Sequence, residues 1–166
     1  MTERKFSVQE LRFSYNGPLD IVDFFRAVED WIHKKGFHKD IKKKSEEVTA
    51  KGKRVEWFIE INGELADYAR SVIRLRVLFK NIKDAKIELK GRKKRVQVVD
   101  ALLYFDGILE TDLEGRWYQK PTFYFFRAVY DKYFSHYYTQ RFEAKLTADT
   151  YALYHYIMDY FNSYRE

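Results

Sequence analysis

Apolar and polar side chains mostly alternate in VEWFIEI, residues 55–61, and in IRLRVLFK, residues 73–80. Residues 99–105, VDALLYF, continue the pattern. Successive side chains of a β-strand point to opposite faces, so this alternation predicts strands with one dry and one solvated face. Such strands are typical of an antiparallel sheet that is covered on one side only.

Glycine-containing pairs punctuate the region from His38 to about Leu113. The pairs are Lys51-Gly52, Asn62-Gly63, Lys90-Gly91 and Asp106-Gly107. Asn-Gly and Asp-Gly favour two-residue hairpin turns, because type I′ turns need positive φ at both central positions. We therefore predict about six strands joined as a meander, with one of the breaks at residues 81–84.

A strand from about Lys5 to Tyr15 precedes this region and brings the predicted number of strands to about seven. Its apolar phase changes at Gln9-Glu10, which predicts a β-bulge. The triplet Asn16-Gly17-Pro18 then predicts the start of a helix. Apolar residues follow at helical spacing, and Gly36 after two lysines predicts the helix end. These apolar residues are Ile21, Phe24, Phe25, Val28, Trp31 and Ile32.

The last third of the chain is aromatic. From Trp117 to Tyr164, 18 of 48 residues are Trp, Tyr or Phe, so this segment either fills a core or lines a pocket with hydroxyl groups. Pro121 predicts the start of a helix that runs to about Glu143, and Thr147 predicts the cap of a second helix. The second helix is expected to bury one face, formed by Tyr151, Tyr154, Ile157, Met158, Phe161 and Tyr164.

These elements predict a single α+β domain over residues 1–166, with an antiparallel sheet under C-terminal helices. Their order resembles the helix-grip architecture of the START and Bet v 1-like superfamily. The residues that carry the resemblance are the Asn16-Gly17-Pro18 triplet, the glycine-marked turns and the aromatic helix from Pro121. The resemblance implies a curved sheet that grips a long C-terminal helix, with an apolar ligand in the gap between them.

A binding protein for an apolar or amphipathic small molecule, anionic ones included, is the first functional hypothesis. Aromatic and basic residues on one half of the predicted helix would supply hydrogen bonds and a counter-charge. The candidate ligand-binding residues are Arg127, Tyr130, Tyr133, Tyr137 and Arg141. The alternative is an amphipathic helix with core aromatics, whose arginines reach solvent or pair with a carboxylate such as Asp131.

Basic clusters lead to a second hypothesis, a nucleic-acid or anionic-surface binder. The candidate residues are Lys42, Lys43, Lys44, Arg92, Lys93, Lys94 and Arg95. The alternative is that these charges solvate turns and protect strand edges. A net charge of +6 permits an anionic partner without requiring one. A third hypothesis is a structural subunit whose aromatic face packs on another chain.

Other functional classes have less support in the sequence. The chain has no cysteine, which excludes disulfides and thiolate metal sites, and the histidines lack the spacing of a zinc helix. Asp100 beside Tyr104 could act as a general acid or base, or could lie on a solvated sheet face. No catalytic or cofactor motif is found, so we predict no cofactor and no metal, and an enzyme is the functional class with the least support. Without an apolar leader or spanning stretch, we expect a soluble cytoplasmic protein. Lys and Glu enrichment with few Asn and Gln is typical of thermophiles.

Overall fold

The computed structural model describes residues 3–50, 52–66, 69–89, 91–111 and 135–164. These residues form an α+β fold, as predicted. The elements in chain order are β1 (Glu3–Leu19), α1 (Ile21–Lys34), β2 (His38–Thr49), β3 (Gly52–Ala66), β4 (Ala69–Leu89), β5 (Arg92–Thr111) and α4 (Ser135–Asn162).

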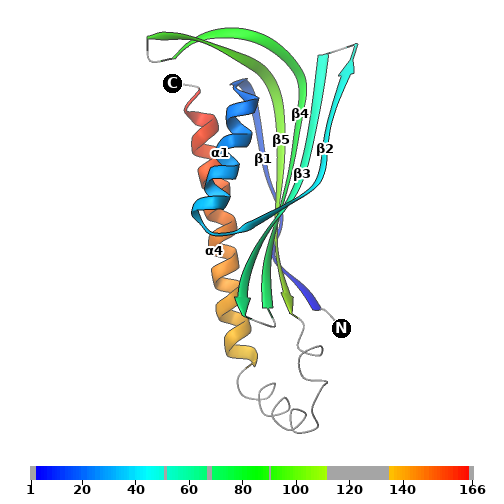
Figure 1. Cartoon of the computed structure of the whole chain (residues 1–166), viewed down its shortest axis with the longest axis vertical. Helices are drawn as coiled ribbons and strands as arrows, with labels where there is room; N and C mark the ends of the chain where they lie inside the picture. Colours follow the sequence, from blue (N-terminus) through cyan, green and yellow to red (C-terminus); the bar gives the residue numbers. More distant parts are fainter. Residues whose placement is uncertain (1–2, 51, 67–68, 90, 112–134, 165–166) are drawn as a thin grey trace.

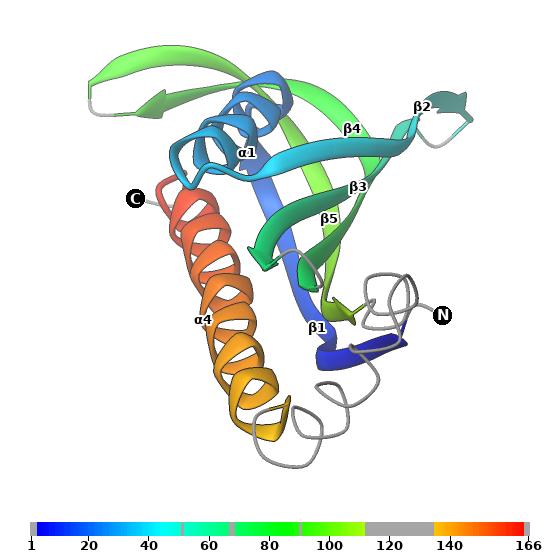
Figure 2. The ribbon, with the colours of Figure 1, turned by 60° about the horizontal axis from the view of Figure 1, so that its bottom comes forward.

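The strands form one antiparallel sheet in the order β1-β5-β4-β3-β2. Both helices lie on the same side of this curved sheet (Figure 1 and Figure 2). We call the side toward α1 and α4 the inner face and the opposite side the outer face. Beyond the helices, β4 and β5 continue as a two-stranded ribbon that bends over the ends of α1 and α4.

The prediction of about seven strands is wrong, because three predicted breaks lie inside long strands. Asn62 and Gly63 pair with Val72 and Ser71, so they belong to the β3–β4 ladder. Gly107 likewise pairs with Ile73 and lies inside β5. The break at residues 81–84 is instead a register shift between Lys80 and Lys83. The strand changes next to Gly52 and Gly91 are as predicted.

Both misinterpreted glycines allow a close approach between elements. A Cβ atom on Gly107 would lie 2.7 Å from Thr150 Oγ1 of α4. A Cβ atom on Gly63 would lie 2.7 Å from Phe37 Cε1. Glycine within a strand often marks a place where another segment comes close, and that explanation replaces the predicted hairpins.

The predicted bulge in β1 is confirmed by a register shift between Val8 and Leu11. Glu10 has a φ of 51°, and its backbone N–H donates to Asp106 Oδ1 at 2.7 Å. Val8 pairs with Gly107 and Leu11 pairs with Phe105, so the bulge places both apolar residues over the same face of β5. The extra residue of the bulge therefore keeps the apolar residues on one face, although the apolar–polar alternation of the sequence changes phase there.

The predicted helix start at Asn16-Gly17-Pro18 is wrong. These residues pair with residues 98–100 of β5, where Pro18 is tolerated because β1 is an edge strand. Asp20 is the N-cap instead, and its Oδ1 accepts from Asp23 N at 3.2 Å. The predicted end is confirmed, because α1 stops at Lys34 and Gly36 has a φ of 73°.

The predicted break near Thr147 is also wrong, because α4 runs through it from Ser135 to Asn162. Lys145 pairs with Asp149 at 2.8 Å, and Thr150 Oγ1 donates to Leu146 O at 2.8 Å. The buried face also differs from the predicted one, since Tyr151 is 41% exposed. The buried residues among the described side chains of this helix are Leu146, Thr150, Leu153, Ile157 and Phe161, and Tyr164 just after the helix is also buried. Residues 121–134 of the other predicted helix lie outside the described residues.

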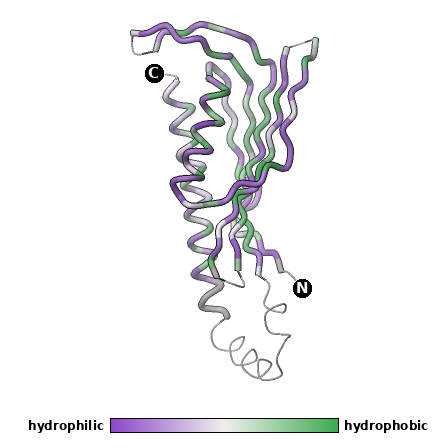
Figure 3. Tube along the Cα trace, viewed as in Figure 1, coloured by the Kyte–Doolittle hydropathy of each residue, from purple (hydrophilic) through white to green (hydrophobic). Residues whose placement is uncertain are grey.

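The core lies between the inner face of the sheet and the two helices. Phe161 of α4 stacks on Tyr15 of β1 with ring centroids 4.8 Å apart, and on Phe24 of α1 at 5.3 Å. Figure 3 shows hydrophobic residues recurring along the central strands, whereas β2 is mostly hydrophilic. The sheet therefore contributes one covered face, and β2 contributes an exposed edge.

Candidate nucleic-acid interface

Cations and aromatic rings alternate along one line across the outer face. The pairing register places Lys43 opposite Phe58, Phe58 opposite Arg76, Arg76 opposite Tyr104, and Tyr104 opposite Arg12. Directly opposed residues in neighbouring antiparallel strands project from the same face. We call these five residues the cation–aromatic row. It crosses all five strands of the sheet.

Each arginine of the row lies over the ring of a row neighbour. Arg76 Cζ is 4.9 Å from the centre of the Phe58 ring, and Arg12 Cζ is 5.1 Å from that of Tyr104. Both rings are half-buried and both arginines are exposed. Such cation–π contacts contribute about 0.5–1 kcal/mol at exposed sites. The planar guanidinium groups are thus held against the sheet with a surface toward solvent.

The carboxylates beside the row are engaged with cations other than its two arginines. Glu56 pairs with Lys43 at 3.1 Å. Glu60 lies 4.0 Å from Lys42 and 3.9 Å from Arg74. By contrast, Arg12 and Arg76 form no ion pair with another described residue. Their charge therefore remains available to an anion.

The two aspartates of β5 on the outer face, Asp100 and Asp106, have structural partners. Asp106 accepts from the backbone of Glu10, and Asp100 Oδ2 accepts from Asn81 Nδ2 at 2.8 Å. Asn81 has a φ of 54° and lies in the register shift of β4. The two carboxylates thus stabilise the positive-φ backbone conformations of Glu10 and Asn81. The alternative of a general acid or base at Asp100 gains no support from these contacts.

Glu110 marks the end of this face that lies farthest from the ribbon. It is 7% exposed and accepts from Arg70 Nε at 2.9 Å, while Arg4 Nη2 lies 2.9 Å away. A buried carboxylate is stable when cations and hydrogen bonds surround it. These two arginines are therefore committed to the fold, unlike Arg12 and Arg76.

The predicted lysines of β2 lie on different sides of the sheet. Lys43 belongs to the row on the outer face. Lys44 lies over the ring of Phe25 on the inner face, with Nζ 5.2 Å from the ring centre. Lys42 pairs with Asp40 at 2.7 Å, and this hydrogen bond and the charge of Asp40 raise the pKa of Lys42.

The predicted basic residues Arg92, Lys93, Lys94 and Arg95 lie at the start of β5, in the ribbon. Lys94 reaches Tyr164, which follows the end of α4, with Nζ 3.5 Å from the hydroxyl oxygen, and lies 3.9 Å from Asp20. The ribbon end lies on the helix side of the molecule, and the β2–β3 end points the other way in both views (Figure 1 and Figure 2). The two basic clusters are thus not brought together.

The predicted ligand-binding residues are only partly described. Arg127, Tyr130 and Tyr133 lie outside the described residues, and Tyr137 is described only as a residue of α4. Arg141 is exposed. Between the sheet and the described part of α4, aromatic and aliphatic side chains are in direct contact, as at Phe105 and Tyr154 with ring centres 5.5 Å apart. The small-ligand hypothesis stays a prediction.

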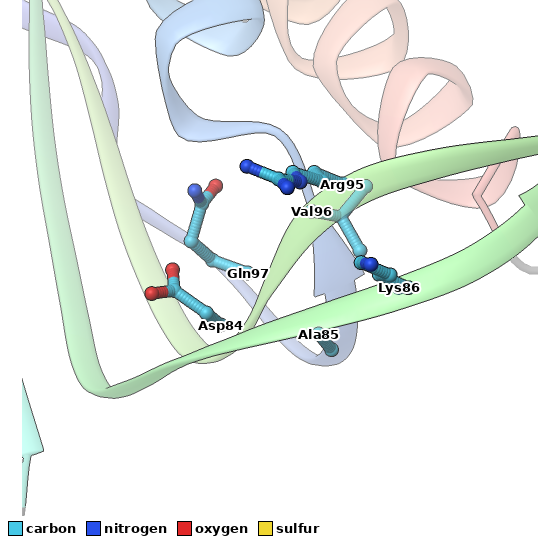
Figure 4. Close-up of a pocket in the computed structure, with 6 residues that line it drawn as sticks. All are labelled: Asp84, Ala85, Lys86, Arg95, Val96 and Gln97. Carbon is cyan, nitrogen blue, oxygen red and sulfur yellow. The ribbon is translucent and has the colours of Figure 1, made fainter.

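A polar hollow of about 580 Å³ lies where the β4–β5 ribbon bends. Figure 4 shows its lining residues on these two strands, near α1 and α4. Gln97 is one of them, and its Oε1 accepts from Ile21 N at the start of α1 at 3.2 Å. The lining residues are Asp84, Ala85, Lys86, Arg95, Val96 and Gln97. Charges of both signs line the hollow, so it favours no single ligand charge.

A hydroxyl network joins the two helices. Tyr160 OH donates to Asp23 Oδ2 at 2.6 Å and lies 3.1 Å from Tyr164 OH. Burial raises the pKa of Tyr160, and the hydrogen bonds to Asp23 and Tyr164 raise it further. Burial also raises the pKa of Tyr156, with smaller contributions from Asp30 and Asp23.

This network predicts a loss of stability at alkaline pH. Because the folded state raises the pKa of Tyr160, its contribution is complete below the unfolded pKa of about 10 and is lost as the pH rises beyond it. We expect the free energy of unfolding to fall with pH above that value, and to fall less steeply in Tyr160→Phe. Urea unfolding across this pH range measures both slopes, with Tyr151→Phe as the control for loss of a hydroxyl on α4. Equal slopes for Tyr160→Phe and the unmodified protein would contradict the prediction.

Among the described residues, no group of His, Asp and Glu side chains could hold a metal ion. His155 is exposed beside Tyr154, and the side chain of His136 lies outside the description. In the described ranges, neither helix is both long and apolar enough to cross a membrane.

No protein-family model, curated protein or solved structure matches the chain. Membership of the helix-grip superfamily therefore stays a prediction.

The row was missed in the sequence although its signals were present. Phe58 stands at a polar position of the alternating stretch 55–61, and Tyr104 shares its face with Asp100 and Asp106. Each residue alone is a common exception to a pattern. Only the register of five strands shows that they lie on one line with Arg12 and Arg76.

Proposed function

We propose that the protein binds single-stranded nucleic acid on the outer face of its sheet. The observation that carries the proposal is the cation–aromatic row. Arg12 and Arg76 lie on half-buried rings and have no carboxylate partner among the described residues. Sheet surfaces that combine stacking groups with positive charge are a common way of binding single strands.

The chemistry of recognition follows from the geometry of the row. Phe58 and Tyr104 lie two strands apart, which is about 10 Å. Unstacked bases can stack on aromatic rings or on the planes of arginine guanidinium groups, and the same guanidinium groups can donate to phosphate oxygens. Base pairs in a duplex do not offer their faces in this way, so single strands are favoured. We expect little sequence preference, because every base has a stacking surface.

Replacing Arg12 and Arg76 by alanine together is expected to weaken binding by about tenfold or more, because two phosphate or stacking contacts are lost. The dependence of log affinity on log salt should also become shallower, by about 0.7 for each lost phosphate contact on a single strand. Fluorescence anisotropy with a labelled single-stranded oligonucleotide, at several salt concentrations, measures both effects. An equivalent duplex should bind more weakly.

Two further variants test what contributes to binding. One removes stacking without removing charge, and the other removes positive charge away from the row. Phe58→Leu with Tyr104→Leu should weaken binding and leave the salt dependence almost unchanged, because no charge is removed. Lys86→Ala with Lys93→Ala removes the same charge from the ribbon and should have little effect. The proposal fails if no oligonucleotide binds at low salt, or if the ribbon variant loses as much affinity as the row variant.

A further inference from the structure

Strand β2 is an open edge of the sheet. It pairs with β3 on one side and ends the strand order on the other. All its residues from His38 to Val48 are exposed, and Ile41 and Val48 are 46% and 81% exposed. An edge strand carries unpaired backbone N–H and C=O groups, which can pair with another strand. The charges along the strand decide which partner fits.

The charges of β2 are complementary to a second copy of the same strand. Residues 42–47 read KKKSEE, with lysines before Ser45 and glutamates after it. In an antiparallel pair with its two-fold axis at Ser45, Lys44 lies opposite Glu46 of the other copy. Lys43 then lies opposite Glu47. Opposite charges directly across an antiparallel pair stabilise it, and like charges destabilise it.

In this register, the lysine and the glutamate of each predicted pair project from the same face of the sheet. Lys43 and Glu47 pair with Phe58 and Arg54, which belong to the outer face, so a Lys43–Glu47 contact lies on that face in both copies. Lys44 and Glu46 pair with Trp57 and Val55 of the inner face. Each lysine can therefore meet its glutamate without twisting the sheet.

Neighbouring registers are less favourable. Because a side chain keeps to its face, the two-fold axis must pass through a residue, and the nearest alternatives are Lys44 and Glu46. An axis at Lys44 places the two Lys44 residues opposite each other, and an axis at Glu46 does the same for glutamates. Lysines on an edge strand usually oppose pairing. Here like charges oppose both neighbouring registers, and the register at Ser45 places opposite charges face to face.

The contacts within one copy leave part of this pattern unused. Lys43 and Glu46 have partners in the same chain, Glu56 and Lys53 respectively. Lys44 lies over the ring of Phe25, and neither Lys44 nor Glu47 forms an ion pair with a described residue. One member of each predicted pair is therefore available for a charge from a second copy.

We propose that two copies of the chain form a symmetric dimer by antiparallel pairing of β2 with β2. The two five-stranded sheets then form one continuous sheet. The outer faces of both copies lie on the same side, so the dimer presents two cation–aromatic rows. An interface made by one strand pair is small, and we expect a weak dimer that dissociates on dilution and at high salt. The proposal does not depend on nucleic-acid binding.

Complementary charge reversals test the dimer and its register together. The acidic variant carries Lys43→Glu with Lys44→Glu, and the basic variant carries Glu46→Lys with Glu47→Lys. Each alone places like charges opposite one another and should dimerise about tenfold more weakly or worse. Mixed in equal amounts, the two variants should form a heterodimer, because every Glu of one then faces a Lys of the other. Sedimentation velocity at low salt measures association of the acidic variant, of the basic variant and of their equal mixture.

Two controls distinguish pairing from unfolding and from net charge. Circular dichroism establishes that each variant is folded, and recovery of the heterodimer could not occur if either had lost β2. Lys86→Glu with Lys93→Glu makes the same change of charge on the ribbon and should leave dimerisation unchanged. An unmodified protein that stays monomeric at its highest soluble concentration in low salt would overturn the proposal. Variants that fail to associate with each other while the unmodified protein dimerises would overturn the register.

Discussion

Replacing Phe161 by alanine is expected to lower the free energy of unfolding by about 3–5 kcal/mol. Its fully buried ring lies within 5.5 Å of the ring centres of Phe13, Tyr15 and Phe24. These rings come from β1 and α1, so Phe161 joins the sheet and both helices at one point. The truncation removes apolar surface and leaves a cavity that three elements would have to move to fill. Domains are stable by about 5–15 kcal/mol, so this one change removes a large fraction.

Chemical denaturation of Phe161→Ala and of the control Tyr151→Ala measures the effect. Tyr151 lies on the same helix and is 41% exposed, so its truncation should change stability by only about 0.5 kcal/mol. Phe161→Leu should fall between the two variants, because it keeps part of the buried volume. Equal losses at positions 151 and 161 would mean that the C-terminal half of α4 does not pack on the sheet as described.

Replacing Gly107 by valine is expected to cost about 3 kcal/mol, at the upper end of the range for overpacking. Even the first added carbon would lie 2.7 Å from Thr150 Oγ1 and 3.1 Å from Ser7 Oγ. Thr150 is fully buried and its hydroxyl is bonded to Leu146 O, so it cannot turn away without losing that bond. Helix α4 would have to move off the sheet.

The sign of the smaller change Gly107→Ala is informative. In a strand with no neighbour above it, alanine would be more stable than glycine by about 0.5–1 kcal/mol. Under α4 we expect a loss instead. In a Thr150→Ala background the loss should shrink, because the atom that meets the new Cβ is gone. A double-mutant cycle of the unfolding free energies measures this coupling, and independent effects at the two positions would contradict the predicted contact.

The sequence predicts the elements better than their ends. The phase change at Gln9-Glu10 predicts the bulge in β1, because side chains must return to the inner face after an extra residue. Gly63 and Gly107 mislead, since glycine serves both turns and close approaches and the sequence does not distinguish them. Thr147 led to the wrong prediction of a helix start, because threonine is also compatible with two structures. A residue that caps helices also occurs inside a helix when burial of Leu146 and Thr150 holds the helix together.

The candidate interface could be predicted only in part. The alternation in residues 73–80 places Arg76 on a solvated face, and residues 99–105 do the same for Tyr104. Whether these two residues meet depends on the register between β4 and β5, which shifts between Lys80 and Lys83, and the bulge in β1 likewise sets whether Arg12 meets Tyr104. A one-residue slip would move every side chain to the other face. An interface built from both basic clusters requires them to share one surface, but β2 and the ribbon carry them to different sides.

Local sequence patterns are enough to predict the α+β class, the antiparallel strands, the bulge in β1 and the amphipathic helix that ends before Gly36. These features depend on covalent geometry and on periods of two or 3.6 residues, which are local. Tertiary structure alone decided that α4 crosses Gly107, that Leu153 is buried while Tyr151 is exposed, and that Arg12 and Arg76 lie on one row. Those outcomes depend on which distant residues come into contact, and that choice belongs to the packing of the whole core rather than to any short stretch of sequence.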